Sequence, residues 1–308
     1  MLEILHTVDG EIINVENPVK GTWINLISPG EEEISEVTRK TGINCDFLKY
    51  PLDDEERARV EVEDNQVLII VSVPIIQQND EIYDTIPLGI IITEDIITTV
   101  CLKEIELLKK FSQGRVKGMA TFKKTRFVFQ IMHRIAALYH KYLREINKKT
   151  NEIEFELQKS MRNKELIRLL ELEKSLVYFT TSLRSNERVM EKLLRSKIIK
   201  MYEEDEDLLE DVIVENKQAI EMADIYSNIL SGMMDAFASI ISNNLNIVMK
   251  FLAVITIVMA IPTMIASFFG MNLTLPFQNS PYGFLLVLCI SAVFCFFSVI
   301  YLIRKNMF

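Results

Sequence analysis

The sequence predicts an α+β cytosolic domain, followed by long stalk helices and a C-terminal hairpin of two transmembrane helices. Short β-rich runs alternate with turn residues over residues 1–120. Glycine and proline are missing between Lys124 and Arg195, where Leu, Ile and charged residues recur at helical spacing. From Phe251 to Ile303, 53 successive residues include no Lys, Arg, Asp, Glu or His. A water-soluble core rarely needs such a run, whereas the hydrocarbon core of a bilayer does.

The elements of the N-terminal domain follow from local patterns. Runs rich in β-branched residues predict buried strands at 22–27, at 67–76 and over 86–101. A helix is predicted at 31–41, because acids occupy its first turn and suit the positive end of the helix dipole. A short helix is predicted at 102–111.

Three long helices are predicted after this domain. Two lie near 125–160 and 164–197, and a third begins near Glu206. The third has no proline before Pro262 and one glycine, Gly232, so it is expected to continue unbroken into the membrane. At 1.5 Å per residue it would extend about 90–100 Å, roughly three bilayer thicknesses. Most of it must therefore stand outside the membrane as a stalk.

The apolar tail divides into two spans, at 251–269 and 284–303, each long enough to cross the hydrocarbon core. Lys250 precedes the first span, and Arg304 and Lys305 follow the second. Because basic flanks stay inside, we expect both termini in the cytoplasm of a cell-membrane protein. A simple membrane anchor for a cytosolic domain is the alternative. The expected divisions are 1–120 (α/β domain), 121–204 (long antiparallel helices), 205–250 (stalk), 251–269 (first span), 270–283 (outer loop) and 284–303 (second span).

The first span carries small and polar residues three or four positions apart, which places them on one helix face. They are Asn246, Met249, Ala253, Thr256, Ala260, Thr263 and Ser267. Close helix packing alone would explain such a stripe. If the stripe lines a pore instead, several copies of the chain must surround one axis, since a single hairpin encloses nothing. The second span is bulky and uniformly apolar, so it would face lipid.

The tripeptide Gly270-Met271-Asn272, at the end of the first of two terminal spans, resembles the signature of the CorA superfamily of divalent cation channels. The stretch SNNLNIVMKFLAVITIVMAIPTMIASFFGMN (242–272) is similar to the family's pore helix throughout. The resemblance extends to TWINLISPGEEEI near the start and to PLDDEERARVE (51–61), so it covers nearly the whole chain.

The resemblance implies a funnel-shaped homopentamer that lets Mg²⁺ flow passively into the cell, with Co²⁺ and Ni²⁺ often carried as well. Gly270, Met271 and Asn272 would form the selectivity filter, where a ring of Asn272 carboxamides bonds to the waters that Mg²⁺ holds tightly. Met249 and Leu252 would form an apolar constriction that stops ions by drying out. The other implied pore-lining residues are Asp235, Asn246, Thr256, Ala260, Thr263 and Ser267. The outer loop departs from the family in having no acidic residue.

The segment 203–211 packs seven acids into nine residues. A solvated helix start, stabilised by the helix dipole, is one interpretation. The family resemblance implies another, in which bound Mg²⁺ bridges neighbouring subunits and closes the channel when cytosolic Mg²⁺ is high. Asp211 matches the stalk position of such a sensor, and Asp80, Glu81 and Asp84 are candidate partners.

Several function classes are disfavoured. The net charge of −9 argues against nucleic acid as a partner. The sequence has no glycine-rich phosphate loop, G-x-S-x-G or H-E-x-x-H, so no enzyme class is supported. His133 and His140 share a helix face without a carboxylate at ligand spacing in the sequence, which favours packing or surface roles. Two alternatives stay open: a Zn²⁺ transporter of the same fold, and a membrane-anchored scaffold or signalling protein.

Overall fold

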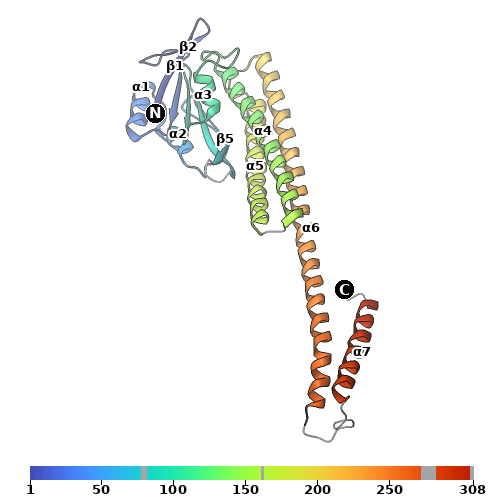
Figure 1. Cartoon of the computed structure of the whole chain (residues 1–308). Coiled ribbons are helices and arrows are strands. Elements are labelled where there is room, and N and C mark those ends of the chain that lie inside the picture. The colour runs from blue at the N-terminus through green and yellow to red at the C-terminus, as the bar shows by residue number, and fades with distance from the viewer. Residues whose placement is uncertain (78–81, 161–162, 272–281, 306–308) are drawn as a thin grey trace. The chain divides into compact units, whose positions relative to one another are not determined.

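The structure is a computed structural model that describes residues 1–77, 82–160, 163–271 and 282–305 (Figure 1). It divides into two compact units, Met1–Gly232 and Met233–Phe308, which are described separately. The strands are β1 Leu2–Val8, β2 Glu11–Asn14, β3 Trp23–Ile27, β4 Arg59–Glu63, β5 Gln66–Gln77, β6 Ile82–Ile92 and β7 Ile97–Cys101. The helices are α1 Glu31–Thr41, α2 Cys45–Lys49, α3 Glu106–Ser112, α4 Lys124–Ser160, α5 Asn163–Ser196, α6 Glu203–Phe269 and α7 Gly283–Arg304, with a 3₁₀ turn at Tyr50–Leu52.

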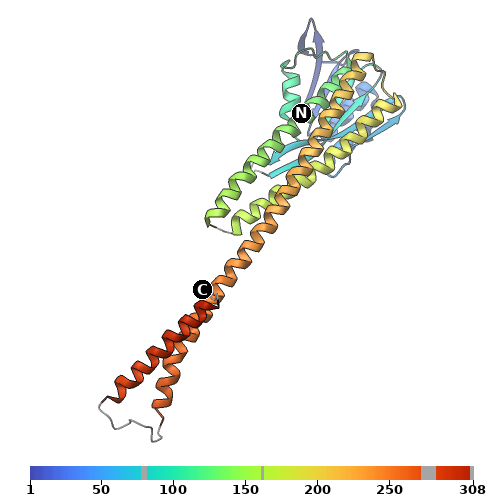
Figure 2. The same ribbon diagram turned by 90° about the vertical axis from the view of Figure 1, so that its right-hand side faces the viewer.

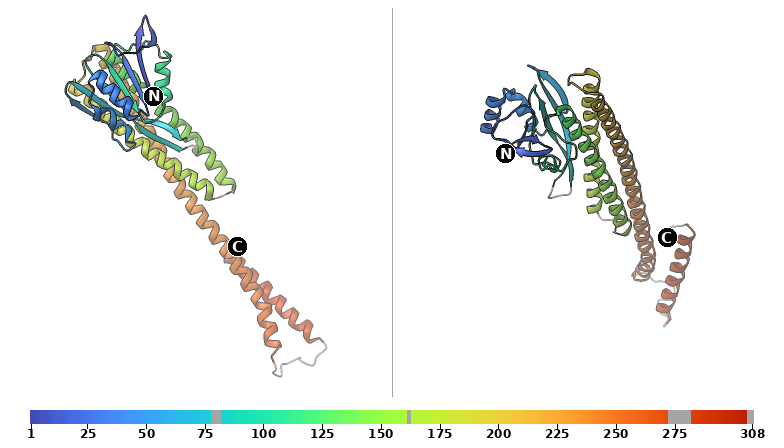
Figure 3. Two further views of the ribbon diagram at one scale, coloured as in Figure 1. Left: turned by 90° about the vertical axis from the view of Figure 1, so that its left-hand side faces the viewer. Right: turned by 90° about the horizontal axis from the view of Figure 1, so that it is seen from above.

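Within the described residues of the first unit, seven strands form one mixed sheet in the order β2-β1-β3-β7-β6-β5-β4. Only the β3–β7 pair is parallel, and the other neighbours are antiparallel. The views in Figure 3 show α1 and α2 on one face of the sheet and α4 and α5 on the other. Both faces of the central strands are therefore covered, which explains their nearly continuous apolar sequences.

The face under α1 and α2 holds a core of aliphatic and aromatic side chains. Ile34 and Val37 of α1 and Phe47 and Leu48 of α2 are at most 2% exposed and pack against the sheet. At the start of α1 the Glu33 carboxylate accepts a hydrogen bond from the Gly30 N–H at 3.1 Å. This satisfies a backbone donor that the helix leaves free, and it confirms the predicted helix at 31–41.

On the opposite face, α5 replaces a missing strand. The pairing of β4 with β5 ends at Arg59↔Ile70, so the backbone of β5 has no strand partner on that edge beyond this point. The Ser72 N–H donates to Oδ1 of Asn186 at 2.8 Å, and Nδ2 of Asn186 donates to the Ser72 carbonyl at 2.8 Å. Tyr139 donates to the same carbonyl at 3.1 Å. One amide side chain, 3% exposed, thus satisfies a buried strand edge.

The long helices follow the prediction more closely than the sheet does. The helices predicted near 125–160 and 164–197 correspond to α4 and α5, which lie side by side in Figures 1 and 2. The strands β1, β2 and β4 were not predicted. The helix predicted at 102–111 begins only at Glu106, because the chain first leaves strand β7 and buries Ile105 ahead of the helix.

The second unit contains the end of α6 and the whole of α7. In the part of the chain that the structure describes, α6 and α7 are the two helices long and apolar enough to cross a membrane. Inside this unit most side chains of α6 are exposed, including those of Phe251, Leu252 and Met259. So much exposed apolar surface requires lipid or other protein chains to cover it.

Candidate functional site

The membrane-length part of α6 has two unlike faces. On one face Val254 is 2% exposed, and Val258, Ile261 and Ile265 are half-buried. These four positions are spaced four, three and four residues apart, so they form one stripe that packs on α7. The second span therefore covers an aliphatic face of the first span.

Pro262 helps to decide where α7 packs. Proline has no N–H, so the carbonyl four residues earlier, that of Val258, loses its helical partner. The thiol of Cys295 on α7 donates a hydrogen bond to this carbonyl, with Sγ 3.6 Å from the oxygen. A sulfur donor is weak, but in hydrocarbon the alternative is an unsatisfied carbonyl.

The other face of α6 is the small and polar stripe that the sequence predicts. All seven of its side chains are exposed: Asn246, Met249, Ala253, Thr256, Ala260, Thr263 and Ser267. A groove of about 690 Å³ lies along this side of α6, and its lining combines Thr256, Ala260, Thr263 and Ser267 with the apolar side chains of Ile255, Met259, Met264 and Phe268. Leu252, the second member of the predicted constriction, is 51% exposed, and Met249 is 58% exposed.

The threonine hydroxyls on this face donate their protons to backbone carbonyls of the same helix. Oγ1 of Thr256 donates to the Leu252 carbonyl at 2.8 Å, and Oγ1 of Thr263 donates to the Met259 carbonyl at 3.0 Å. With its proton used inside the helix, each oxygen keeps lone pairs that accept hydrogen bonds from outside. Neutral oxygen acceptors of this kind suit the water shell of a hydrated cation better than they suit an anion.

Gly270 and Met271, the first two residues of the predicted filter, directly follow the end of α6 at Phe269. The N–H of Gly270 donates to the Ala266 carbonyl at 2.9 Å and continues the helical bonding by one residue. A Cβ atom on Gly270 would lie 3.3 Å from that carbonyl oxygen, which is a tight contact that favours glycine. Met271 is 48% exposed, and Asn272 lies outside the described residues.

The acidic segment at the start of α6 divides into two sets. Three of its acids hold the helix start: Glu204 pairs with Arg126 at 2.9 Å, Glu206 with Lys197 at 3.3 Å, and Asp205 accepts from the Tyr202 N–H at 3.3 Å. Glu203, Asp207, Glu210 and Asp211 are exposed, share one helix face, and have no ion pair within the described residues. The solvated helix start and an outward-facing acidic face are thus both present.

The proposed partners of Asp211 are only partly described. Asp84 on β6 accepts from Nε2 of Gln77 and from the Thr85 N–H, each at 2.8 Å. Asp80 and Glu81 lie outside the described residues. Over the described ranges of this single chain, no three His, Cys, Asp or Glu side chains gather as metal ligands. Asp235, the predicted acidic ring residue, is exposed on α6 in the second unit.

The two histidines of α4 find a partner that the sequence does not indicate. Nε2 of His133 lies 3.3 Å from a carboxylate oxygen of Glu215, and Nε2 of His140 lies 2.9 Å from the backbone carbonyl of the same residue. Both contacts join α4 to α6 within the first unit. Nothing in local spacing reveals them, because the glutamate is 75 residues away from His140.

Comparison with known proteins agrees with this architecture. A family model described as "CorA-like Mg²⁺ transporter protein" matches residues 20–304. The cobalt/magnesium transport protein CorA of Methanocaldococcus jannaschii is 30% identical over 294 residues, which cover 92% of this chain and 90% of that protein. The magnesium transport protein CorA of Helicobacter pylori is 25% identical over 295 residues, which cover 92% of this chain and 90% of that protein.

The fold is also that of a solved relative. The complete structure of the CorA magnesium transporter from Methanocaldococcus jannaschii superimposes with a TM-score of 0.87 at 26% identity, and the match covers 100% of this chain and 99% of that one. This confirms the predicted fold class of a soluble α/β domain, a long helix and two apolar C-terminal helices. Members of the matched family are ion transporters and not enzymes. The chain belongs to the CorA family of Mg²⁺ transporter proteins.

Proposed function

We propose that this protein carries Mg²⁺ across a membrane as a homo-oligomer, with the polar stripe of α6 lining the path. The observation that carries the proposal is the contrast between the two faces of this helix. An aliphatic face packs on α7, while Thr256, Thr263 and Ser267 stay exposed on the other face, and the two threonine hydroxyls use their own protons within the helix. The transport of magnesium or cobalt named for the relatives supports the same assignment.

Several chains are needed, since one hairpin cannot surround an ion. Around a common axis the polar stripes would face one another, and α7 would face lipid. A pentamer with a funnel shape is the assembly that the family resemblance implies. The boundaries at 120, 204, 250, 269 and 283, and the placement of both termini in the cytoplasm, are part of this proposal.

The path would select a hydrated ion. Mg²⁺ is small and loses its waters reluctantly, so a filter of neutral amide and hydroxyl oxygens can bond to those waters without stripping them. In the proposed assembly Asn272, with Gly270 and Met271, forms this filter, and Asn246, Thr256, Ala260, Thr263 and Ser267 line the path. Met249 and Leu252 form an apolar ring that lets ions pass when it is wide and blocks them, by excluding water, when it is narrow. A divalent ion gains about 4.6 kcal/mol per 100 mV of inside-negative potential, so no ATP is required.

Mg²⁺ uptake into liposomes that contain the purified full chain tests the proposal. We expect Asn272→Ala to reduce the initial rate by about tenfold or more, because its carboxamide selects the hydrated ion at the mouth. Asn17→Ala, an exposed asparagine in the first unit, is the matched control and should keep the wild-type rate. If vesicles that contain the protein were impermeable to every divalent ion, the transport proposal would fail and the membrane-anchored scaffold would be the remaining interpretation. Uptake of Zn²⁺ in place of Mg²⁺ would support the alternative cargo.

Regulation by cytosolic Mg²⁺ is the finer part of the proposal. The exposed acids Asp207, Glu210 and Asp211 on α6 would repel acids of a neighbouring copy, with Asp80, Glu81 and Asp84 as candidates. Bound Mg²⁺ would relieve this repulsion and hold the closed state, within the limit set by its preference for that state. Asp235 would add an acidic ring nearer the pore.

Raising the Mg²⁺ concentration on the cytosolic side tests this sensor. Uptake by the wild-type protein should fall, whereas uptake by Asp211→Asn should continue at higher cytosolic Mg²⁺ concentrations. Asp64→Asn, which makes the same change in the exposed turn between β4 and β5, should behave as wild type. Unchanged inhibition in Asp211→Asn would refute the sensor assignment and leave the conduction proposal standing.

A further inference from the structure

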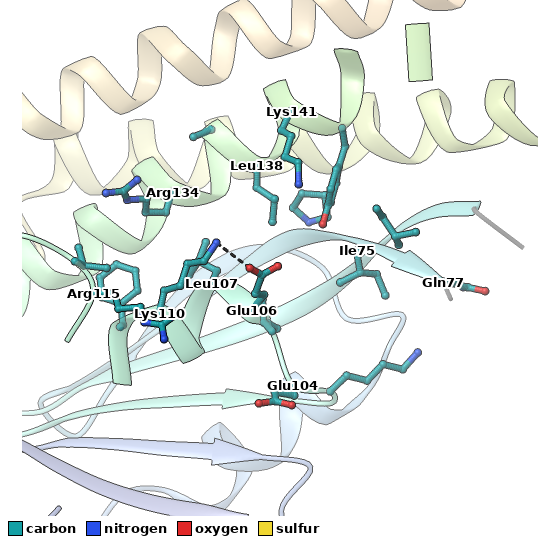
Figure 4. Close-up of a pocket in the computed structure, with 18 residues that line it drawn as sticks. Ile75, Gln77, Glu104, Glu106, Leu107, Lys110, Arg115, Arg134, Leu138 and Lys141 are labelled. Atoms are coloured by element: carbon teal, nitrogen blue, oxygen red, sulfur yellow. Dashed lines mark ion pairs between the residues drawn. The ribbon is translucent and has the colours of Figure 1, made fainter. Parts of the chain in front are cut away.

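A cleft of about 1160 Å³ opens in the first unit between the end of β5, the segment around α3, and the exposed side of α4. Figure 4 shows its lining, with Arg134 and Lys141 on α4 and Lys110 and Glu106 on α3. The cleft includes none of the residues proposed for the ion path or its regulation, although Gln77 at its edge donates a hydrogen bond to Asp84, one of the candidate sensor acids. Its volume exceeds the range of about 300–1,000 Å³ usual for small-molecule sites, so it accommodates a ligand of nucleotide size.

The charge of this cleft is opposite to that of the chain. The chain as a whole carries a net charge of −9, but five cations and two acids line the cleft. The cations are Lys103, Lys110, Arg115, Arg134 and Lys141, and the acids are Glu104 and Glu106. A cleft lined mainly by cations attracts anions even though the protein as a whole is acidic.

Both acids are already paired. Glu106 holds Lys110 at 2.9 Å, and Glu104 holds Lys109, which lies outside the cleft, at 2.9 Å. Arg115 and Arg134 are exposed, and the described part of the chain offers them no ion pair. Two guanidinium groups therefore remain for an incoming ligand, and guanidinium groups bind phosphate oxygens through paired hydrogen bonds.

The spacing of the cations suits an extended anion rather than a point charge. Arg134, Leu138 and Lys141 recur at four and three residues on α4, so they lie on one face. The two cations at its ends are separated by about 10 Å along the helix axis, and Lys141 lies 3.7 Å from the Glu145 carboxylate, so Arg134 is the unpaired one of the two within the described residues. In Figure 4 Arg115 lies beneath Arg134 at one end of the cleft, and Lys141 extends from α4 near the other end.

Apolar side chains complete the lining, and the supporting helices are held in place. Ile75, Leu138 and Tyr142 contribute apolar or aromatic surface to the cleft. Beneath them Phe111 of α3 is fully buried and packs edge-on against Phe127 of α4, with ring centroids 5.4 Å apart. The cations on α3 and α4 are thus presented by two helices that share a core contact, so little ordering is required on binding.

The geometry points to a site for a nucleoside polyphosphate, with the phosphates on Arg115 and Arg134 and the nucleoside against Ile75, Leu138 and Tyr142. A basic surface without apolar lining would bind phosphate chains as well as nucleotides. The mixed lining here favours a ligand that has both a polyanion and a ring system.

Binding to the purified full chain in detergent, measured by calorimetry in excess EDTA, tests this site apart from any transport of Mg²⁺. ATP, tripolyphosphate and adenosine are the probes. We expect ATP to bind more tightly than either of its parts. Arg115→Ala/Arg134→Ala should weaken ATP binding by about tenfold or more, because two charge-assisted contacts are lost. Adenosine binding should change little in that variant.

The matched control is Arg39→Ala/Arg57→Ala, which removes the same charge from exposed positions outside the cleft. It should bind ATP as wild type does. If ATP were held only by nonspecific charge attraction, binding would weaken equally in both double variants. Wild-type ATP affinity in Arg115→Ala/Arg134→Ala, or no ATP binding by the wild-type chain, would overturn the site. Equal affinity for tripolyphosphate and ATP would overturn the nucleoside assignment. None of these results depends on whether the protein conducts Mg²⁺.

Discussion

The two parts of α6 find their packing partners in different ways. Up to Leu230 its inward positions are buried by the same chain, and they recur at helical spacing: Leu209, Val212, Ile213, Asn216, Ala219, Ala223 and Leu230. From Ala238 to Ala253 nearly every side chain is exposed, although the sequence becomes more apolar. The first part is therefore stabilised within one chain. The second part needs lipid or other protein chains to cover it.

The largest expected effect tests what covers the second part. Thr256→Trp places a bulky ring on the polar stripe, whereas Ile257→Trp makes a similar change on the neighbouring, non-stripe face. If the stripe lines a pore, the first variant should reduce Mg²⁺ uptake by about tenfold or more by filling the path.

The second variant should keep most of its uptake, since its ring would face lipid or a loosely packed surface. The measurement is liposome flux, with the oligomeric state checked by size-exclusion chromatography. Equal loss in both variants would indicate that the two faces of this helix do not differ in function.

The next effect concerns the stability that the first unit supplies by itself. A Cβ atom at Gly89 on β6 would overlap Cγ of Pro51, which is sterically impossible without movement. We expect Gly89→Ala to lower the free energy of unfolding by about 2 kcal/mol or more. Thermal unfolding of the purified protein measures this.

Gly30→Ala is the matched control, because a Cβ atom there meets nothing within 4 Å and the φ angle is −79°. Because Gly30 is the N-cap of α1, where alanine is less favourable than glycine, the loss should be at most about 1 kcal/mol and clearly smaller than that of Gly89→Ala. If both substitutions were equally mild, the close contact between β6 and the 3₁₀ turn would not be rigid.

A smaller loss is expected where α5 replaces a strand. Asn186→Ala leaves the buried N–H of Ser72 without its acceptor, which should cost about 2 kcal/mol of unfolding free energy. Tyr139→Phe removes the second bond to the Ser72 carbonyl, which keeps its bond from Asn186, together with a hydrogen bond between Tyr139 and Ser182. It should cost about 1 kcal/mol, and a larger loss than in Asn186→Ala would contradict this account.

The smallest effect is expected in the second unit. Cys295→Ala removes the thiol that donates to the Val258 carbonyl beside Pro262. Because a thiol is a weak donor, we expect a loss of unfolding free energy of at most about 1 kcal/mol. Cys289→Ala, an exposed thiol on the same helix, is the control and should have no measurable effect on thermal unfolding. A loss comparable to that of Gly89→Ala would mean that specific contacts hold this hairpin as tightly as the sheet.

Local patterns were sufficient for α1, for the long helices α4, α5 and α6, and for α7, whereas the short helix α2 was not predicted. Helical spacing, the lack of glycine and proline, and an uncharged run are properties of neighbouring residues, and each follows from backbone or solvent energetics at that place. The tripeptide Gly270–Asn272 was identified in a different way, by its resemblance to a family signature. The short strands β1, β2 and β4 were missed, because their few residues are stabilised by partners elsewhere in the sheet.

Tertiary structure alone decided which distant groups meet. The carboxamide of Asn186 reaches Ser72 across 114 positions, Cys295 reaches the carbonyl freed by Pro262 across 37, and the basic cleft joins β5, α3 and α4. Such contacts depend on how the elements pack, since each buried polar group takes the nearest partner that the fold offers. Patterns along the chain show which groups need partners, and the three-dimensional arrangement determines which partners they find.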